Sequence, residues 1–261
     1  MNNLVIGNTS QLSHYFPDDY EKISSRNIDF DNILTKEYDS IYILFSEQRT
    51  FLNESLDFFT NVNVDYTIEV INKLKNNAKR IVIYSTSELW NDYDGCVSVN
   101  DPYSYNETPY IKSKEILCNH INQNRDEYNN VIIVYPFNFN SVYRKEGFLF
   151  SKIYKSLLYG EKISIGDIDF SRDLIHPKTI VDNSIKTDKD ILIGSGGLFN
   201  VKNFVYDIYK LHNKKLEDYI SVEDKNNLPN KRKDYYSCIK YSSYDDLLNL
   251  TIKDIYEYKI S

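Results

Sequence analysis

Short apolar runs recur through the first half of the chain, and longer amphipathic stretches separate them. Several of these runs lack the polar alternation of a half-exposed strand, which is typical of parallel strands covered by helices on both faces. The pattern predicts an α/β protein with a doubly wound parallel sheet, whose ligand crevice lies at the carboxyl ends of the strands. The expected strands are residues 4–6, 22–24, 40–45, 80–85 and 131–137, and the expected helices between them include 63–77 and 113–121.

After residue 137 the pattern changes. Residues 148–159 read as a helix that Gly160 closes, 162–166 as a short strand, and the remainder as helices with a few short strands. We therefore expect one domain over 1–137 and a smaller α/β lobe over 138–261, with some segments of that lobe returning to the sheet. The polar stretch 223–234 reads as a mobile surface connection.

Composition excludes several classes of protein. At about 150 residues per domain, 261 residues suggest one large domain or a domain with an appendage. The 38 acidic residues outnumber the 31 basic ones, which argues against a nucleic-acid partner held through phosphate contacts. The apolar runs are too short to span a membrane, and the start of the chain lacks a basic export signal. We expect a cytoplasmic protein without a membrane partner.

The cysteines and histidines are scattered. Cys96, Cys118 and Cys238 are odd in number and far apart, so we expect reduced thiols and neither a disulfide framework nor a zinc site. The histidines form no metal-binding pattern, and no metal is expected. Their positions are His14, His120, His176 and His212.

Tyr110 and Lys114 stand four residues apart, so on a helix both side chains project from one face. A phenol has a pKa near 10, and an ammonium about 4 Å away favours the phenolate by roughly 4 kcal/mol at an effective dielectric constant of ~20, before desolvation opposes it. Such a pair suits proton transfer near neutral pH. The same spacing also occurs on solvated helix faces, so only the surrounding sequence can show whether the pair belongs to a catalytic site.

Four segments in order carry a resemblance to the extended short-chain dehydrogenases/reductases, the group of nucleotide-sugar epimerases, dehydratases and reductases. The family's strand followed by S-T/S-x-x-V-Y is similar to residues 85–90, and its Y-x-x-x-K to 110–114. Its R-P-x-N is similar to residues 135–138, and its R-D-hydrophobic-hydrophobic-H/V to 172–176. The resemblance implies a Rossmann-like, NAD(P)-binding domain and a substrate-binding lobe.

The resemblance also implies roles for single residues. Thr86 would hydrogen-bond the substrate oxygen and Tyr110 would transfer the proton. Lys114 would lower the pKa of Tyr110 and hold the nicotinamide ribose. Asn138 and Arg172 would face the sugar and its nucleotide diphosphate. These roles agree with the chemistry, because a ketone that receives a hydride becomes an alkoxide that must be protonated.

The glycine-rich first turn departs from the family pattern. The chain reads GNTSQLS, in which Gly7 matches and Ser10 and Ser13 replace the other two glycines. Gln11 and Leu12 complete the turn expected to bind the pyrophosphate. A Cβ at Ser10 would crowd the cofactor, although its hydroxyl offers a donor to phosphate. Cofactor binding is therefore expected to be weakened or lost.

Arg26 follows the second expected strand, about where the residue that contacts the adenosine ribose belongs. A cation there favours a 2′-phosphate, so NADP(H) is preferred and NAD(H) stays possible. The alternative is an exposed loop arginine.

Residues after Thr86 bear on the reaction. The 4,6-dehydratases carry Asp-Glu there, whereas this chain has Ser87 and Glu88, both expected at the substrate. The complete dehydratase pair is therefore absent, and the altered first turn together with Arg26 favours NADPH-dependent reduction of a nucleotide-linked 4-keto-6-deoxy sugar. By analogy with the family, the setting would be deoxysugar biosynthesis for a surface polysaccharide. The alternatives are a nucleotide-sugar epimerase and a non-catalytic relative that binds a nucleotide or a protein. His176 is expected to be structural, with a substrate contact as the alternative, and Trp90 to pack in the core.

The resemblance to the family also implies a homodimer. The candidate helices for a four-helix interface are 63–77 and 109–126.

Overall fold

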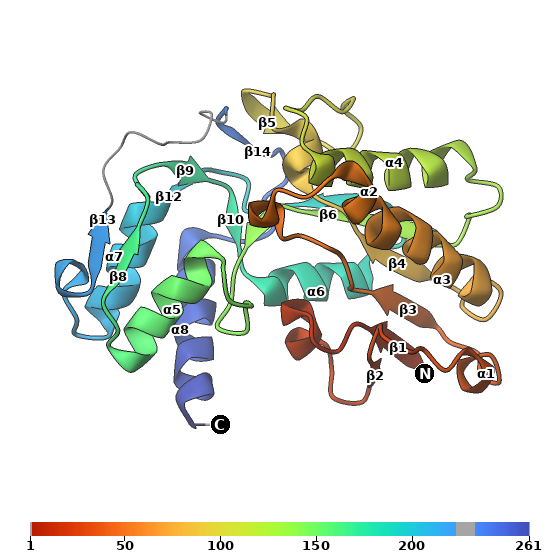
Figure 1. Ribbon diagram of the computed structural model, residues 1–261, viewed down its shortest axis with the longest axis horizontal. Helices are drawn as coiled ribbons and strands as arrows, with labels where there is room; N and C mark the ends of the chain where they lie inside the picture. The colour runs from red at the N-terminus through yellow and green to blue at the C-terminus, as the bar shows by residue number, and fades with distance from the viewer. Residues whose placement is uncertain (1, 223–232, 261) are drawn as a thin grey trace.

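A six-stranded, all-parallel sheet forms the centre of the molecule, in a computed structural model that describes residues 2–222 and 233–260 (Figure 1). Most of the expected mobile connection, 223–232, lies outside the described residues. The strand order is β11-β6-β4-β3-β1-β2. The predicted α/β class with a doubly wound parallel sheet is confirmed. The strands are β1 (Asn3–Ile6), β2 (Glu21–Ile23), β3 (Ser40–Ile43), β4 (Ile81–Tyr84), β6 (Val131–Pro136) and β11 (Ile191–Ile193).

Helices cover both faces of this sheet, as the apolar runs require. Successive strand residues point to opposite faces, so Ile41 and Ile43 pack in one core with α3 and α4, while Tyr42 packs in another with α6 and the short helix η1. The helices of this part are η1 (Gln11–Tyr15), α1 (Phe30–Ile33), α2 (Leu56–Thr60), η3 (Asn61–Tyr66), α3 (Thr67–Leu74), α4 (Pro109–Gln123) and α6 (Pro177–Lys186).

The second lobe lies beside the sheet and has its own core (Figure 1). It contains α5 (Leu149–Tyr159), α7 (Val201–Leu211), η5 (Leu216–Asp218) and α8 (Tyr244–Ile260), with the pair β8 (Ile163–Ile165) and β13 (Ile220–Val222). Gly160 ends α5 at φ +74°, and β8 occupies the expected strand, so both predictions are confirmed. β11 and α6 belong to the later half of the chain and join the sheet and its cover. The boundary at 137/138 stays a prediction.

Short strand pairs connect the two parts. β7 (Asn138–Phe139) pairs with β10 (Leu174–Ile175), β9 (Ser171–Arg172) with β12 (Phe199–Asn200), and β5 (Gly95–Val97) with β14 (Tyr235–Ser237). The helices η2 (Thr50–Leu52) and η4 (Ser87–Trp90) follow the carboxyl ends of β3 and β4. Trp90 is fully buried, as predicted.

Asp254 on α8 joins the two parts through a buried contact. Its carboxylate accepts hydrogen bonds from the Tyr15 hydroxyl and from His176 Nε2, the latter at 3.0 Å. His176 is 1% exposed and caps α6, where its Nδ1 accepts from the Lys178 amide. The structural interpretation of His176 is thereby confirmed.

The prediction that all three cysteines are reduced is wrong. Cys96 and Cys238 form a disulfide whose Cα atoms are 4.8 Å apart. The two residues are 142 positions apart, and the pairing of β5 with β14 that unites them leaves no spacing signal in the sequence. Cys118 is a buried free thiol.

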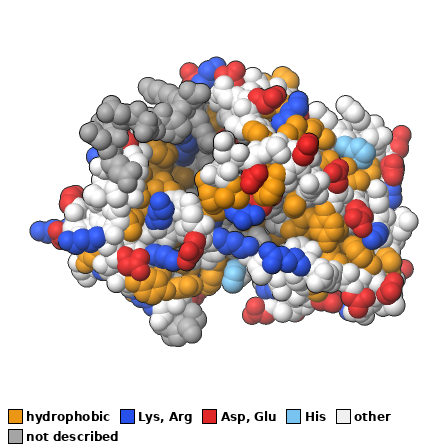
Figure 2. Space-filling view, viewed as in Figure 1, with side chains coloured by type: hydrophobic (Ala, Val, Ile, Leu, Met, Phe, Trp, Pro, Cys, Tyr) orange, Lys and Arg blue, Asp and Glu red, His pale blue; other side chains and the backbone are white. Residues whose placement is uncertain are grey.

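The surface gives limited guidance on partners. On the face in Figure 2, basic and acidic side chains are interspersed, without a single large basic patch. Within residues 2–222 and 233–260, no helix is long and apolar enough to cross a membrane. None of the large hydrophobic side chains exposed there comes from 63–77 or 109–126, so the homodimer stays a prediction.

Replacing Asp254 tests the contact between the two parts. We expect Asp254→Leu to lower the free energy of unfolding by about 3 kcal/mol, because Tyr15 and His176 lose a buried acceptor. Urea denaturation followed by circular dichroism measures the change. Glu257→Gln, on an exposed part of the same helix, should change it by less than about 0.5 kcal/mol. A loss below about 1 kcal/mol for Asp254→Leu would contradict the interpretation.

Candidate active site

The chain leaves β4 through a cluster of hydroxyl residues at the carboxyl edge of the sheet. Thr86 caps η4, and its Oγ1 accepts a hydrogen bond from the Glu88 amide at 3.2 Å. Thr86 is 8% exposed and Ser87 is 2% exposed. The Glu88 carboxylate accepts from Asn91 Nδ2 at 3.3 Å. Thr86 and Glu88 therefore have well-defined positions beside the end of β4.

Tyr110 reaches this cluster from the first turn of α4. Thr108 caps the helix by accepting from the Ile111 amide at 3.3 Å, and Pro109 occupies the first turn, where its missing N–H costs nothing. The Thr86 hydroxyl lies close enough to the Tyr110 phenol to lower its pKa. The structure thus brings together the two residues expected to bind one substrate oxygen.

Lys114 lies one turn further along α4 and is 2% exposed. Its Nζ donates to the carbonyl oxygen of Tyr84, the last residue of β4, at 3.0 Å. Burial lowers the pKa of Lys114 to about 8. A buried ammonium whose pKa is lowered is a good hydrogen-bond donor for a hydroxyl group of a bound ligand.

The pKa of Tyr110 departs from the expectation. Burial and the nearby charge of Glu88 raise it above its ordinary value, while the Thr86 hydroxyl and the charge of Arg144 lower it. The expected net lowering by Lys114 is not what the structure shows, because desolvation dominates and the Lys114 ammonium is directed at the Tyr84 carbonyl. Tyr110 is therefore protonated at neutral pH.

Arg144 is a site residue that sequence reasoning missed. It follows β7, and its guanidinium lies 3.8 Å from the centre of the Phe148 ring. Its Nε is buried and finds no hydrogen-bond partner among the residues that the structure describes, and burial lowers the pKa of Arg144 to about 10. A buried unpaired donor costs about 1–3 kcal/mol, so an acceptor on a ligand would be favoured there. Nothing in the sequence separates this arginine from a surface one.

Asn63 was also missed. It lies in the π-helical segment η3, a geometry often found at functional sites. Its side-chain amide donates to Ser113 Oγ and to the Glu47 carbonyl, both at 3.0 Å, and accepts from the Glu47 amide at 2.8 Å. Ser113 lies between Tyr110 and Lys114, so Asn63 connects the segment after β3 to the helix that carries both.

The first turn retains the first glycine of a phosphate-binding loop, Gly7. Gly7 has φ +114°, and a Cβ there would lie 3.2 Å from Phe45 N, so only glycine fits. Ser10 caps η1, accepting from the Leu12 amide at 3.4 Å, and Ser13 Oγ donates to the Asn8 carbonyl at 2.7 Å.

The helix after this turn is only the 3₁₀ helix η1, too short for a strong dipole. Gln11 Oε1 accepts from Ser141 Oγ at 3.2 Å, and Leu12 is buried in the core.

A cavity of about 180 Å³ lies at the carboxyl end of β2, where the adenosine end of a dinucleotide would bind. Arg26 is exposed at its edge, and Glu21 and Asp29 also line it. Both carboxylates are engaged, Glu21 with Lys36 at 3.0 Å and Asp29 with the Asn32 amide at 3.2 Å. Arg26 follows β2, whereas the Tyr110 cluster lies where β4 ends, and this separation suits an extended cofactor.

The two expected substrate residues lie on short strands that belong to two different pairs. Asn138 on β7 is paired with Leu174, and Arg172 on β9 is paired with Phe199. The Arg172 guanidinium lies 4.7 Å from the centre of the Phe170 ring. In the part of the chain that the structure describes, no group of three His, Cys, Asp or Glu side chains could hold a metal ion.

Comparison with known families agrees with this arrangement. The family profile described as GDP-mannose 4,6 dehydratase matches residues 52–246, well over half of the chain. The chain belongs to this family, within the extended short-chain dehydrogenases/reductases. The match begins after the first turn, which is the segment that departs most from the family pattern. No curated protein sequence is a significant match.

Solved structures show the fold of this dehydratase family over the whole chain. A UDP-N-acetylglucosamine 4-epimerase from Methanobrevibacter ruminantium M1 has a TM-score of 0.79 at 17% identity, covering 98% of both chains. RMD from Pseudomonas aeruginosa, complexed with NADPH, has a TM-score of 0.77 at 12% identity, covering 100% of both. A dTDP-glucose 4,6-dehydratase from Streptomyces venezuelae, with NAD bound, has a TM-score of 0.75 at 17% identity, covering 98% of this chain and 97% of its own.

The lowered pKa of Lys114 predicts a pH-dependent stability. Between pH 8 and 10.5 the unfolded chain binds more protons than the folded protein, so this group makes stability rise with pH, by about 3 kcal/mol in total. Lys114→Met lacks this contribution. Its free energy of unfolding minus that of the native protein should therefore fall by about 3 kcal/mol over this range.

Urea unfolding at intervals from pH 7 to 10.5 measures this difference. Lys112→Met, on the same helix, removes a partly exposed ion pair with Glu115 in which the pKa of Lys112 is raised, so its difference from the native protein should not fall over this range. A pH-independent difference for Lys114→Met would show that Lys114 is not held with a lowered pKa.

Proposed function

We propose that this member of the family is an NADPH-dependent reductase of a nucleotide-linked 4-keto-6-deoxy sugar. The observation that carries the proposal is that the Thr86 hydroxyl and the Tyr110 phenol come together on the same α4–β4 junction as buried Lys114, at the carboxyl edge of the sheet. A ketone oxygen placed against this pair has one hydrogen-bonding partner and one proton donor. We further propose a cytoplasmic homodimer that acts in deoxysugar biosynthesis for a surface polysaccharide.

A nicotinamide cofactor fits the residues present. Gly7 leaves room for a phosphate at the first turn, Ser10 keeps its hydroxyl proton for donation, and Lys114 offers an ammonium to the nicotinamide ribose. Arg26 offers a charge to a 2′-phosphate, which favours NADP(H) over NAD(H). The cofactor, when bound, supplies the hydride.

The protonation state of Tyr110 favours the reductive direction. With a pKa above its ordinary value, its phenol is protonated at neutral pH and can act as an acid. The phenol donates its proton to the ketone oxygen as that oxygen gains negative charge, and Thr86 hydrogen-bonds the same oxygen. Arg144 then stabilises the phenolate that remains, because its positive charge already acts on Tyr110.

Positive charge also suits the substrate. Arg172 and Arg144 supply two guanidinium groups on the lobe side, and Asn138 supplies an amide near Arg172 through the pairing of β7 with β10. A nucleoside diphosphate offers oxygens that guanidinium groups bind well. Glu88, beside Thr86, is a candidate partner for a sugar hydroxyl, whereas Ser87 is buried.

A nucleotide-sugar epimerase is the second candidate. The similarity to the UDP-N-acetylglucosamine 4-epimerase favours it, and an epimerase would change a stereocentre without net consumption of NADPH. Product analysis separates the two. A non-catalytic relative is the third candidate, motivated by the serines of the first turn and the short η1.

Tyr110→Phe tests the acid. We expect turnover to fall by about 10²–10⁴-fold with cofactor affinity nearly unchanged, because only the proton donor is lost. The measurement is NADPH oxidation with a nucleotide-linked 4-keto-6-deoxy sugar. Tyr93→Phe removes an exposed hydroxyl that donates to the Pro102 carbonyl and should keep full activity. Full turnover by Tyr110→Phe would exclude the mechanism.

Arg26→Ala tests the cofactor preference. We expect the Kd for NADPH to rise about tenfold, with the Kd for NADH within about twofold, since one charge-assisted contact is worth about 1.5–3 kcal/mol. Titration followed by cofactor fluorescence gives both constants. Lys79→Ala removes an exposed charge elsewhere and should change neither. If neither cofactor bound the native protein at millimolar concentration, the non-catalytic candidate would lead.

A further inference from the structure

The Cys96–Cys238 disulfide lies at the outside of the molecule and joins two short paired strands. Cys96 is in β5 and Cys238 directly follows β14, and both residues are exposed. A reductant can therefore reach the bond. Exposed disulfides have the more oxidising potentials and are the ones that are readily reduced, whereas buried structural disulfides resist reduction.

Besides the disulfide, the two strands are held by their pairing with each other and by buried Val97 and Tyr235, the latter packed on Phe137. β5 and β14 form a two-stranded sheet with three paired positions, and two-stranded sheets are marginal by themselves. An ion pair between Lys233 and Asp92 at 2.9 Å is half-exposed and adds little. The disulfide is thus the main covalent constraint on the position of β14.

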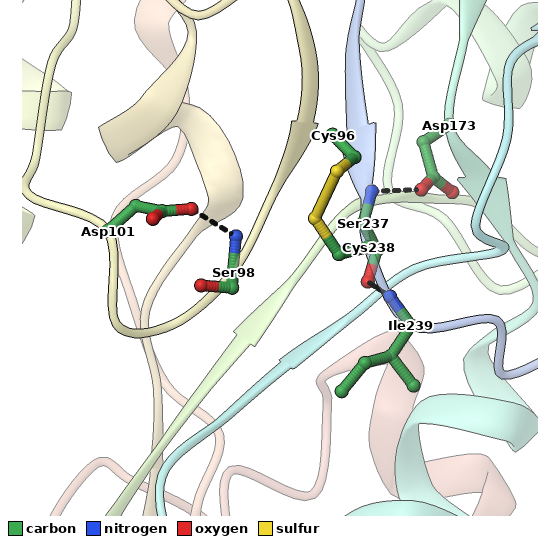
Figure 3. Close-up of a disulfide and its surroundings, with 7 residues drawn as sticks. All are labelled: Cys96, Ser98, Asp101, Asp173, Ser237, Cys238 and Ile239. Atoms are coloured by element: carbon green, nitrogen blue, oxygen red, sulfur yellow. Dashed lines mark hydrogen bonds between the residues drawn. A yellow bond between two sulfur atoms is a disulfide. The ribbon is translucent and has the colours of Figure 1, made fainter.

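β14 in turn supports the buried carboxylate of Asp173, and Figure 3 shows the hydrogen bond between Ser237 and Asp173 beside the disulfide. The Ser237 amide donates to one oxygen of Asp173 at 3.0 Å, and the Ser195 amide and hydroxyl donate to the other at 2.6 and 2.7 Å. Asp173 is fully buried, and burial raises its pKa. Loss of the Ser237 donor would leave this carboxylate short of a partner, which is costly for a buried acid.

Asp173 directly follows Arg172, so its position fixes the segment that presents Arg172. The contact continues along the chain, because the Tyr241 amide donates to the Gly194 carbonyl at 3.1 Å and Lys240 forms a bridge with Gly194. One covalent bond on the outside therefore connects through β14 to the strand that carries Arg172 and to the loop of Ser195.

We propose that Cys96–Cys238 is a reversible thiol–disulfide switch that controls the order of the Arg172–Asp173 segment and of the 194–197 loop. A dithiol reductant attacks one sulfur through its thiolate, forms a mixed disulfide, and is released as a cyclic or protein disulfide when its second thiol attacks. The protein gains two electrons and two protons, and the reductant loses the same. The consequence for substrate binding rests on the proposed function; the change in order does not.

The third cysteine does not interfere. Cys118 is 0% exposed, its thiol donates to Ser85 Oγ at 3.2 Å, and burial raises its pKa. It stays a thiol in both states and offers no alternative disulfide partner.

The first test measures the redox equilibrium of the full chain. The protein is equilibrated in mixtures of reduced and oxidised dithiothreitol, free thiols are blocked with iodoacetamide, and mass spectrometry locates the label. We expect Cys96 and Cys238 to become labelled together in one two-electron transition of the folded protein, with Cys118 unlabelled. Labelling of Cys96 and Cys238 under all conditions, or reduction only after unfolding, would overturn the proposal.

The second test measures amide hydrogen exchange of the oxidised and the reduced protein. Reduction should raise exchange about tenfold or more at Ser195 and Ser237, whose amides donate to Asp173, and leave β4 unchanged. No change at Ser195 would overturn the proposal, since the disulfide would then have no effect on the 194–197 loop. An equal rise in β4 would also overturn it, since the disulfide would then act only on global stability.

A double variant, Cys96→Ser with Cys238→Ser, serves as the control. It should show the exchange of the reduced protein with or without dithiothreitol. If this variant does not fold, reduction of the native protein in place still decides the outcome. Failure of the reductase assay together with a localised rise in exchange would reject the proposed function and leave the switch standing.

Discussion

A parallel sheet buried on both faces is the constraint on which the rest of the structure depends. Because α3 and α4 cover one face and α6 with η1 the other, both faces of the sheet are filled mainly by apolar side chains, and neither offers room for a ligand. Polar side chains meet where the strands end. Gly7 follows β1, Thr86 follows β4, and Asn138 follows β6, all at the same edge, and α4 returns Tyr110 and Lys114 to it. The site is thus a consequence of strand direction.

The strands and the Tyr110–Lys114 pair could be predicted because local patterns encode them. Uninterrupted apolar runs and a four-residue spacing are visible in one short window of sequence. Arg144, Asn63 and the disulfide have no such window. Arg144 differs from a surface arginine only because it is buried against Phe148. Asn63 differs from a surface asparagine because it hydrogen-bonds Ser113 on another helix. Cys96 and Cys238 meet only because β14 pairs with β5.

The electrostatics of the site also depend on tertiary structure. Spacing alone suggested that an ammonium would lower the pKa of Tyr110, but burial acts on both groups and moves each toward its neutral form. Desolvation therefore outweighs the attraction that the spacing implied. A phenol that keeps its proton suits the donor role, and Arg144 supplies a charge where that proton leaves.

The first turn shows how a weakened local element can be held by distant ones. η1 is a single 3₁₀ helix, too short to fix itself, and its residues instead contact the segments beyond β6. Gln11 accepts a hydrogen bond from Ser141, and Tyr15 donates one to Asp254 on α8. The His14 ring stacks on Tyr143, with 3.9 Å between the ring centres. The position of the cofactor turn therefore depends on the lobe that is expected to bind the substrate. In a protein built this way, order in that lobe and the shape of the phosphate-binding turn cannot vary independently, because the same three contacts fix both.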